Sequence, residues 1–259
     1  MNSKIPISIL LWFLVSCTRQ PKPVMNPGIV QIASASNENP FKKIASIPLP
    51  EGYSRLAADS GSFSAWLRDI NLKKDMVVHQ FNGRWKLNQA AQFAVLDISV
   101  GEKDLQQCAD AVMRLRAEFL FDKKAYSDIS FADNDEKTYQ FSQPYIRSNF
   151  HHYLERVFGM CGTASLSKQL KPVDMNEVQP GDVLIRGGFP GHAVIVMDVA
   201  INKQQKKIFL LAQSYMPAQD IHILNNPSDK VLSPWYAVNE SEDIPTPEYL
   251  FKRNELKRW

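Results

Sequence analysis

The fold is decided by two neighbouring stretches, Gln179-Pro180-Gly181-Asp182-Val183-Leu184-Ile185 and Gly191-His192-Ala193-Val194-Ile195-Val196. Short apolar runs that begin at Gly and Pro are typical of buried β-strands. We predict strands over 182–186 and 192–199. Two further runs of the same kind predict strands over 207–213 and 220–224.

A cysteine stands just upstream of these strands, in the stretch Phe158-Gly159-Met160-Cys161-Gly162-Thr163. We expect a helix to begin near Cys161 and to end before Pro172. The thiolate is the reactive form of cysteine, and a helix start beside an imidazolium lowers a thiol pKa from about 8.5 to between roughly 3.5 and 7.5. Cys161 and His192 are therefore the predicted nucleophile and general base of a cysteine hydrolase.

A third residue is needed to orient the imidazole of His192. Asp198 lies on the same strand, but at ~3.3 Å per residue it is about 20 Å away. Gln213 on the following strand falls almost opposite His192, and its amide can fix the ring tautomer. The sequence does not set the strand register, so Ser214 and Tyr215 remain alternatives.

The tract from Cys161 to Gln213 resembles the papain-like superfamily, in particular NlpC-type cell-wall endopeptidases and CHAP amidases. The resemblance lies in the cysteine at a helix start, the Pro-Gly-Asp strand opening at 180–182, the strand that begins at His192, and the polar residue on the next strand. It implies an α+β fold in which an antiparallel sheet packs against a cysteine-bearing helix, with an N-terminal α/β extension. It also implies a catalytic triad of Cys161, His192 and Gln213.

Residues around the predicted triad are candidates for a substrate groove. Glycines at three positions would let backbone approach a substrate closely, although an ordinary tight turn also explains them. Tyr153 is a guess for a second oxyanion donor. The groove candidates are Gly162, Thr163, Gly187, Gly188, Gly191 and Tyr153.

Other interpretations of the two downstream cysteines stay open. Cys161 and His192 can instead be a buried helix-start residue and a hydrogen-bonded strand end. Cys108 falls on an apolar stripe of a helix predicted over 104–121, which favours a small buried core residue. A Cys108–Cys161 disulfide is the remaining alternative for an exported protein.

The N-terminus predicts export and lipidation. Lys4, the apolar run from Ile5 to Val15 and Leu14-Val15-Ser16-Cys17 resemble the signal peptide and lipobox of bacterial lipoproteins. The run is shorter than the ~20 residues of a membrane-spanning helix. We expect residues 1–17 to be a signal peptide and acylated Cys17 to anchor the protein to a cell-envelope membrane; a plain signal peptide is the alternative.

The rest of the chain divides by composition. Residues 18–40 are rich in Pro, Ser, Asn and Gln and predict a flexible tether, followed by an N-terminal α/β half over 41–144 and a papain-like half over 145–259. The net charge is +3, and the basic residues are dispersed, which argues against nucleic-acid binding. There is no zinc signature or phosphate loop, so we predict no metal and no cofactor.

Most of the mature chain also resembles an uncharacterised family of bacterial lipoproteins, in the stretches 104–112, 161–163, 191–193 and 213–219. The sequence thus predicts an envelope cysteine hydrolase that cleaves an amide or peptide bond, with peptidoglycan as a possible substrate. The alternatives are a non-catalytic envelope lipoprotein that binds glycan or a protein partner, and a cysteine acyltransferase.

Overall fold

The computed structural model describes residues 38–259, which fall within one compact unit. The predicted signal peptide, the lipidation site at Cys17 and most of the predicted tether lie outside the described residues. Within that part, no helix is both long and apolar enough to cross a membrane.

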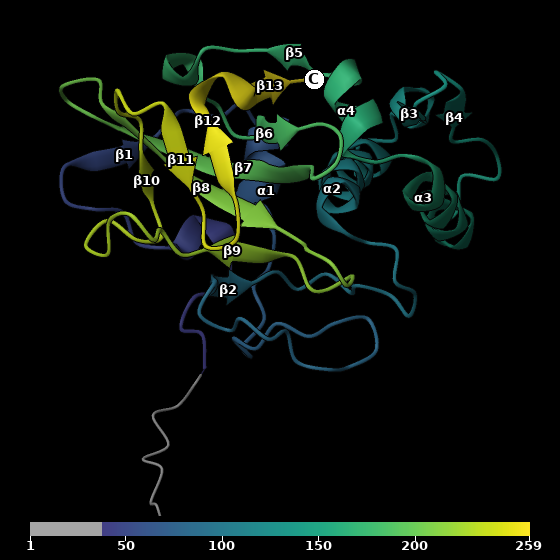
Figure 1. Cartoon of the computed structure of the whole chain (residues 1–259), viewed down its shortest axis with the longest axis horizontal. Coiled ribbons are helices and arrows are strands. Elements are labelled where there is room, and N and C mark those ends of the chain that lie inside the picture. The colour runs from purple at the N-terminus through teal and green to yellow at the C-terminus, as the bar shows by residue number, and fades with distance from the viewer. Residues whose placement is uncertain (1–37) are drawn as a thin grey trace, which may run out of the picture. The chain divides into compact units, whose positions relative to one another are not determined.

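The described chain is a mixed α+β structure built on one large antiparallel sheet (Figure 1). The strand order is β2-β9-β8-β7-β6-β13-β5, and β1 and β10 pair with β7 and β8 outside this path. The nine strands are β1 (Tyr53–Arg55), β2 (Gln92–Val95), β5 (Lys171–Pro172), β6 (Val183–Arg186), β7 (His192–Asn202), β8 (Lys207–Gln213), β9 (His222–Leu224), β10 (Tyr236–Ala237) and β13 (Leu256–Arg258). Because β1 and β2 come from the predicted N-terminal half and the other strands from the C-terminal half, both halves share this sheet.

Two small hairpins and four α-helices complete the described residues. The hairpins are β3 (Ser130–Ala132) with β4 (Thr138–Gln140), and β11 (Asp243–Pro245) with β12 (Leu250–Lys252). The helices are α1 (Phe63–Asp69), α2 (Cys108–Asp122), α3 (Arg147–Met160) and α4 (Thr163–Gln169), and the short 3₁₀ helices are Ile44–Ser46, Tyr126–Asp128, Met175–Glu177 and Arg253–Glu255.

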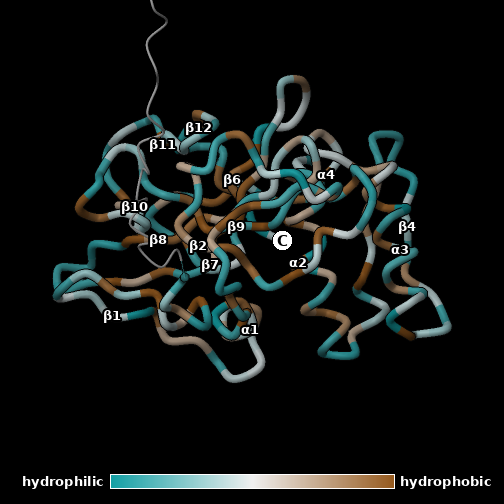
Figure 2. The backbone as a smooth tube through the Cα atoms, turned by 90° about the horizontal axis from the view of Figure 1, so that it is seen from below, coloured by the Kyte–Doolittle hydropathy of each residue, from teal (hydrophilic) through white to brown (hydrophobic). Residues whose placement is uncertain are grey.

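The sheet is buried on both faces, because alternate residues of its central strands enter two hydrophobic clusters. Ile195 of β7 belongs to the cluster that contains α1, α2 and α3, whereas its neighbour Val194 belongs to the cluster that contains β12 and β13. In Figure 1 the β11–β12 hairpin lies on the viewer's side of the sheet and α2 on the far side. The central strands are largely hydrophobic in colour and the peripheral loops largely hydrophilic (Figure 2).

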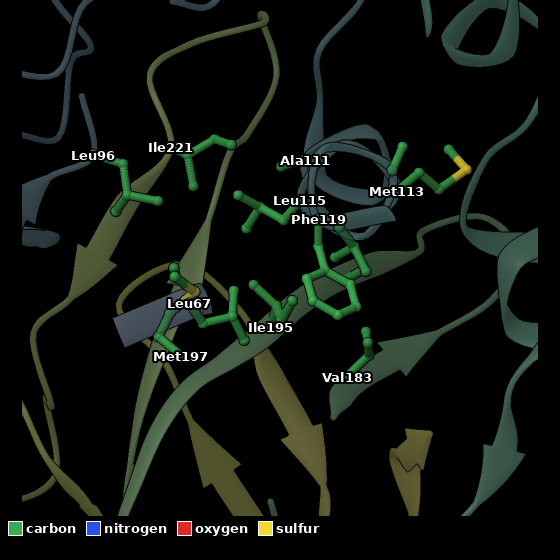
Figure 3. Close-up of a cluster of buried hydrophobic side chains, with 14 of the residues drawn as sticks. Leu67, Leu96, Ala111, Met113, Leu115, Phe119, Val183, Ile195, Met197 and Ile221 are labelled. Atoms are coloured by element: carbon green, nitrogen blue, oxygen red, sulfur yellow. The ribbon is translucent and has the colours of Figure 1, made fainter. Parts of the chain in front are cut away.

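Helix α2 is the helix that covers the centre of the sheet. Its Leu115 and Phe119 point toward Ile195 and Val183 on the strands (Figure 3). The helix begins at Cys108, four residues after the predicted start at Asp104. Gln107 is the N-cap: its backbone is extended, and its N–H donates to the Asp110 carboxylate at 2.9 Å, so the helix does not continue before it. Cys108 is therefore the first residue of the helix.

Asp198 has a structural role on β7. A register irregularity between Val196 and Asp198 interrupts the alternation along the strand. The carboxylate of Asp198 is fully buried and accepts hydrogen bonds from Arg55 Nε and Arg68 Nε, each at 2.6 Å. These ion pairs tie β1 and α1 to the central strand.

Candidate functional site

His192 and Gln213 meet at one end of the central strands. His192 is the first residue of β7 and Gln213 the last of β8, and these antiparallel neighbours bring the two side chains together. His192 Nε2 lies 2.8 Å from Gln213 Oε1. Both side chains are almost completely buried. The predicted contact between the imidazole and the amide is thus confirmed, while its catalytic role stays a prediction.

The neighbours of Gln213 fix the orientation of its amide. Gln213 Nε2 donates to Glu248 Oε2 at 2.6 Å, and a carboxylate can only accept. His222 Nδ1 lies 2.9 Å from the carbonyl oxygen of Asp220, so it carries a proton, and its Nε2 is left as an acceptor 3.5 Å from Gln213 Nε2. Both neighbours therefore require the NH₂ group of Gln213 on their side and its oxygen on the side of His192.

This orientation determines the tautomer of His192. Since Gln213 Oε1 accepts, His192 Nε2 carries the proton, and Nδ1 keeps a free lone pair. A ring nitrogen with a lone pair is what a general base requires. Burial, the largest effect, lowers the pKa of His192 to about 4, although Gln213 and Glu248 act in the opposite direction. The imidazole is therefore neutral at neutral pH.

A buried ion pair ends the network on the side away from His192. Lys86 Nζ lies 2.7 Å from Glu248 Oε2, and the two side chains are only 5% and 13% exposed. Burial lowers the pKa of Lys86, whereas Glu248 raises it. The described residues thus form a continuous chain of polar contacts from His192 through Gln213 and Glu248 to Lys86.

Aromatic rings enclose the imidazole. The centroids of Tyr215, Tyr249 and Phe251 lie 5.1, 5.0 and 5.7 Å from that of His192. The Tyr249 hydroxyl donates to the Pro190 carbonyl oxygen at 3.1 Å, which ties the ring to the loop before β7. These contacts hold the ring plane and keep water away from the histidine.

Cys108 is the cysteine that lies against the histidine strand. The nearby backbone of Ala109, Ala193 and Cys108 itself lowers the pKa of the Cys108 thiol. Ala193 directly follows His192, and the Tyr215 ring packs beside His192. Burial first, and then the carboxylate of Asp110, raise the pKa of the Cys108 thiol to about 11. The sulfur is thus a neutral thiol at the start of α2, next to β7.

Cys161 occupies a different position in the same region. It follows α3 and precedes Gly162, the N-cap of α4, so the expected helix begins two residues after it. Its backbone N–H donates to the Val157 carbonyl oxygen at 2.8 Å and is not available to a substrate. Burial, Asp133 and Asp110 raise the pKa of its thiol to about 11.

Both cysteines line one cavity of about 570 Å³. Four of the predicted groove residues also line it, namely Gly162, Thr163, Gly188 and Gly191. At Gly191 a side chain is excluded, because a Cβ would lie 2.4 Å from the Gly188 carbonyl oxygen and from Thr163 Oγ1. Both cysteines are free thiols, so the alternative of a Cys108–Cys161 disulfide is not realised in this structure.

The other two groove candidates are used elsewhere. Gly187 packs against α4, where a Cβ would lie 3.2 Å from the Thr163 carbonyl oxygen. The Tyr153 hydroxyl donates to the carbonyl oxygens of Tyr139 at 2.8 Å and Ile129 at 3.3 Å. The suggestion that Tyr153 donates to an oxyanion is therefore wrong, because its hydroxyl proton is already hydrogen-bonded to backbone carbonyl oxygens next to the β3–β4 hairpin.

A known protein family matches nearly all of the described residues. The model of a family described as domain of unknown function (4846) matches residues 44–145 and 135–258. The chain belongs to this family. No curated protein and no solved structure matches the chain. The matched segments contain every cavity and network residue named above, so the candidate site lies within the family's domain.

Several members of the network could not be found from the sequence. Glu248 lies in a loop after a Pro-rich stretch, and Lys86 follows a turn more than 150 residues upstream; nothing local to either marks them. The apolar stripe around Cys108 favoured a core residue. That Cys108 is the first residue of α2 became clear only from the structure. Among residues 38–259, no cluster of three or more His, Cys, Asp or Glu is arranged to hold a metal ion.

Proposed function

We propose that this chain is a thiol-dependent hydrolase of amide bonds, with Cys108 as nucleophile, His192 as general base and acid, and Gln213 as the positioning residue. The observation that carries the proposal is the arrangement around β7: a cysteine at the start of a long helix lies close to the backbone of Ala193, the residue that follows a histidine whose tautomer is fixed by an amide. Cys108 replaces Cys161 as the proposed nucleophile, because the Cys108 sulfur lies close to the Ala193 backbone on β7, whereas the Cys161 N–H is already bonded to the Val157 carbonyl oxygen.

The same arrangement supports a papain-like organisation of the unit. A cysteine-bearing helix covers an antiparallel sheet, and the histidine and amide stand on adjacent strands. The cysteine-bearing helix is α2 in this proposal, and not the helix predicted downstream of residue 161. The N-terminal half would then supply the nucleophile and the C-terminal half the base.

The reaction begins from a neutral pair. The Cys108 thiol passes its proton to Nδ1 of His192 as the sulfur attacks the amide carbonyl carbon, and the carbonyl oxygen becomes an oxyanion. The N–H groups of Cys108 and Ala109 belong to the first turn of α2 and have no acceptor within the helix. They are the proposed oxyanion donors.

The second half of the reaction returns both residues to their starting state. The imidazolium gives its proton to the amide nitrogen, the C–N bond breaks, and the amine leaves a thioester on Cys108. His192 then takes a proton from water as the water oxygen attacks the thioester. Collapse of this intermediate breaks the C–S bond, releases a carboxylic acid and returns the proton to sulfur.

We also propose that the enzyme acts at the cell envelope, held by acylated Cys17. The support comes from the sequence only: the signal-peptide pattern of residues 1–17 and the predicted tether that follows it. A peptide of peptidoglycan is the substrate class that fits this location.

The proposal is tested with the full chain, stem peptides of peptidoglycan and a panel of fluorogenic peptide amides. Cys108→Ser is expected to abolish release of amine, whereas the matched variant Cys161→Ser, in the same cavity, retains it. Equal loss in both variants, or activity that survives Cys108→Ser, would contradict the assignment. Transfer of the acyl group to an added amine in place of water would instead favour the acyltransferase.

The raised thiol pKa supports a second candidate function. A Cys108 thiol with a pKa of about 11 beside a histidine with a pKa of about 4 is not an activated ion pair. A non-catalytic lipoprotein that binds peptide or glycan in the same cavity fits this observation. Saturable binding of stem peptides without any turnover would favour it.

A further inference from the structure

Asp110 has a buried carboxyl group in the wall of the cavity. This group has no role in the reaction proposed above. Asp110 is the third residue of α2 and is 5% exposed. Its Oδ2 accepts the backbone N–H of Gln107 at 2.9 Å. Its Oδ1 is shielded from water and has no hydrogen-bond partner among the described residues. A buried carboxylate oxygen without a partner costs free energy, so a retained one calls for an explanation.

The position of Asp110 ties it to the proposed reaction. It lines the same cavity as Cys108 and Cys161, and its charge raises the pKa of both thiols. Burial raises the pKa of Asp110 itself to about 8, with only backbone N–H groups acting against it. No Lys or Arg side chain is among the described residues that line the cavity, and the second acid there is Asp104.

Asp104 does not share this property. Its Oδ1 accepts the backbone N–H of Ala218 at 2.6 Å and a hydrogen bond from Gln107 Nε2 at 3.2 Å, and the residue is exposed. Asp104 is thus a loop-fixing residue in contact with water. Among the described residues that line the cavity, Asp110 is the acid whose buried carboxyl oxygen has no hydrogen-bond partner.

We propose that the cavity takes substrates that carry a positively charged amino group close to the scissile amide, and that Asp110 is the residue that selects them. This inference rests on the proposed hydrolase function. A cation bound beside Asp110 favours the ionised form of its carboxyl group and pairs with it. It also offsets the repulsion that Asp110 exerts on a Cys108 thiolate, so substrate binding activates the nucleophile.

The first test compares two fluorogenic dipeptide amides that differ only in a free or an acetylated N-terminal amine. For the full chain, kcat/KM is expected to be at least about tenfold higher for the free amine, the value of one hydrogen bond to a charged group. Asp110→Asn keeps an acceptor for the Gln107 N–H and is expected to bring the ratio near one. Asp110→Glu and the control Asp104→Asn retain the preference.

The second test does not require turnover. In a Cys161→Ser background, iodoacetamide alkylates Cys108, and alanine amide is added as the cationic probe with N-acetylalanine amide as its neutral match. Alanine amide is expected to change the alkylation rate several-fold, and the change is lost in Asp110→Asn.

The outcomes separate this inference from the proposed function. Equal cleavage of both dipeptide amides overturns the role of Asp110 and leaves the hydrolase intact. No cleavage, but an amine-specific effect on alkylation, overturns the hydrolase and supports the cation site. Neither cleavage nor an amine-specific effect overturns both.

Discussion

Removal of the Glu248 carboxylate tests the buried network most stringently. Glu248→Gln leaves the ammonium of Lys86, which is 5% exposed, without its counter-charge at 2.7 Å. Breaking a buried ion pair from one side costs about 3–5 kcal/mol, because the remaining charge stays out of water. For a unit of this size, that corresponds to a fall in Tm of roughly 6–20 °C.

The same change affects the catalytic network. The glutamine introduced at 248 can present either its oxygen or its NH₂ group to Gln213, so the amide of Gln213 is no longer held in one orientation. We expect Nδ1 of His192 to lose its free lone pair in part of the molecules. The value of kcat should then fall by up to about 100-fold, the lower end of what general base catalysis contributes. Thermal unfolding by circular dichroism and amide hydrolysis measure the two effects.

The double variant Lys86→Met with Glu248→Leu separates stability from catalysis. Removing both charges together regains most of the lost stability, since well-packed apolar residues replace buried ion pairs at little cost. Activity stays low, because Gln213 still lacks its acceptor. The matched control is Glu255→Gln, which breaks the more exposed pair with Arg186 and is expected to cost about 1 kcal/mol or less. A double variant as unstable as Glu248→Gln would refute this reasoning.

Three further predictions concern the cavity wall, the histidine and the β1–α1 anchor. Gly191→Ala is expected to reduce activity strongly and to lower Tm, because its Cβ would lie 2.4 Å from the Gly188 carbonyl oxygen; unchanged kinetics would contradict the close approach. The pKa of His192 falls from 6.5 to about 4 on folding, so its contribution to stability is complete above pH 6.5 and about 3 kcal/mol is lost as pH falls to 4. Urea unfolding at several pH values should show this loss reduced in His192→Gln. Asp198→Asn should cost about 3–5 kcal/mol in urea unfolding, since two partly buried arginines lose a fully buried counter-charge, and a smaller change than in Asp69→Asn would contradict the anchor.

The sequence was sufficient to predict the contact between His192 and Gln213. Both strands are apolar runs with clear ends. Because they are antiparallel, the end of the second strand, at Gln213, lies beside the beginning of the first, at His192. The α+β class with an antiparallel sheet, which the resemblance implied, is also what the structure has, whereas the papain-like organisation stays a proposal. Asp198 was correctly set aside as an orienting residue, although its actual role required the positions of Arg55 and Arg68, far away in the sequence.

The nucleophile was harder to predict, because two cysteines precede two helices. The apolar periodicity around Cys108 extends across residues 104–107, yet the capping box at Gln107 makes these residues non-helical and moves the helix start to the cysteine. Glu248 and Lys86 were missed since their contact joins positions more than 150 residues apart. Pairings of this kind depend on the whole sheet and leave no local pattern.

The central claim, that the Cys108 sulfur attacks the substrate, is tested most directly by trapping the acyl-enzyme. The full chain is mixed with a stem-peptide ester, quenched in acid and digested, and the modified peptide is sequenced by mass spectrometry. The account predicts an acyl group on Cys108 that is absent in His192→Ala and present in Cys161→Ser. An acyl group on Cys161, or none on either cysteine while amide is hydrolysed, would contradict it.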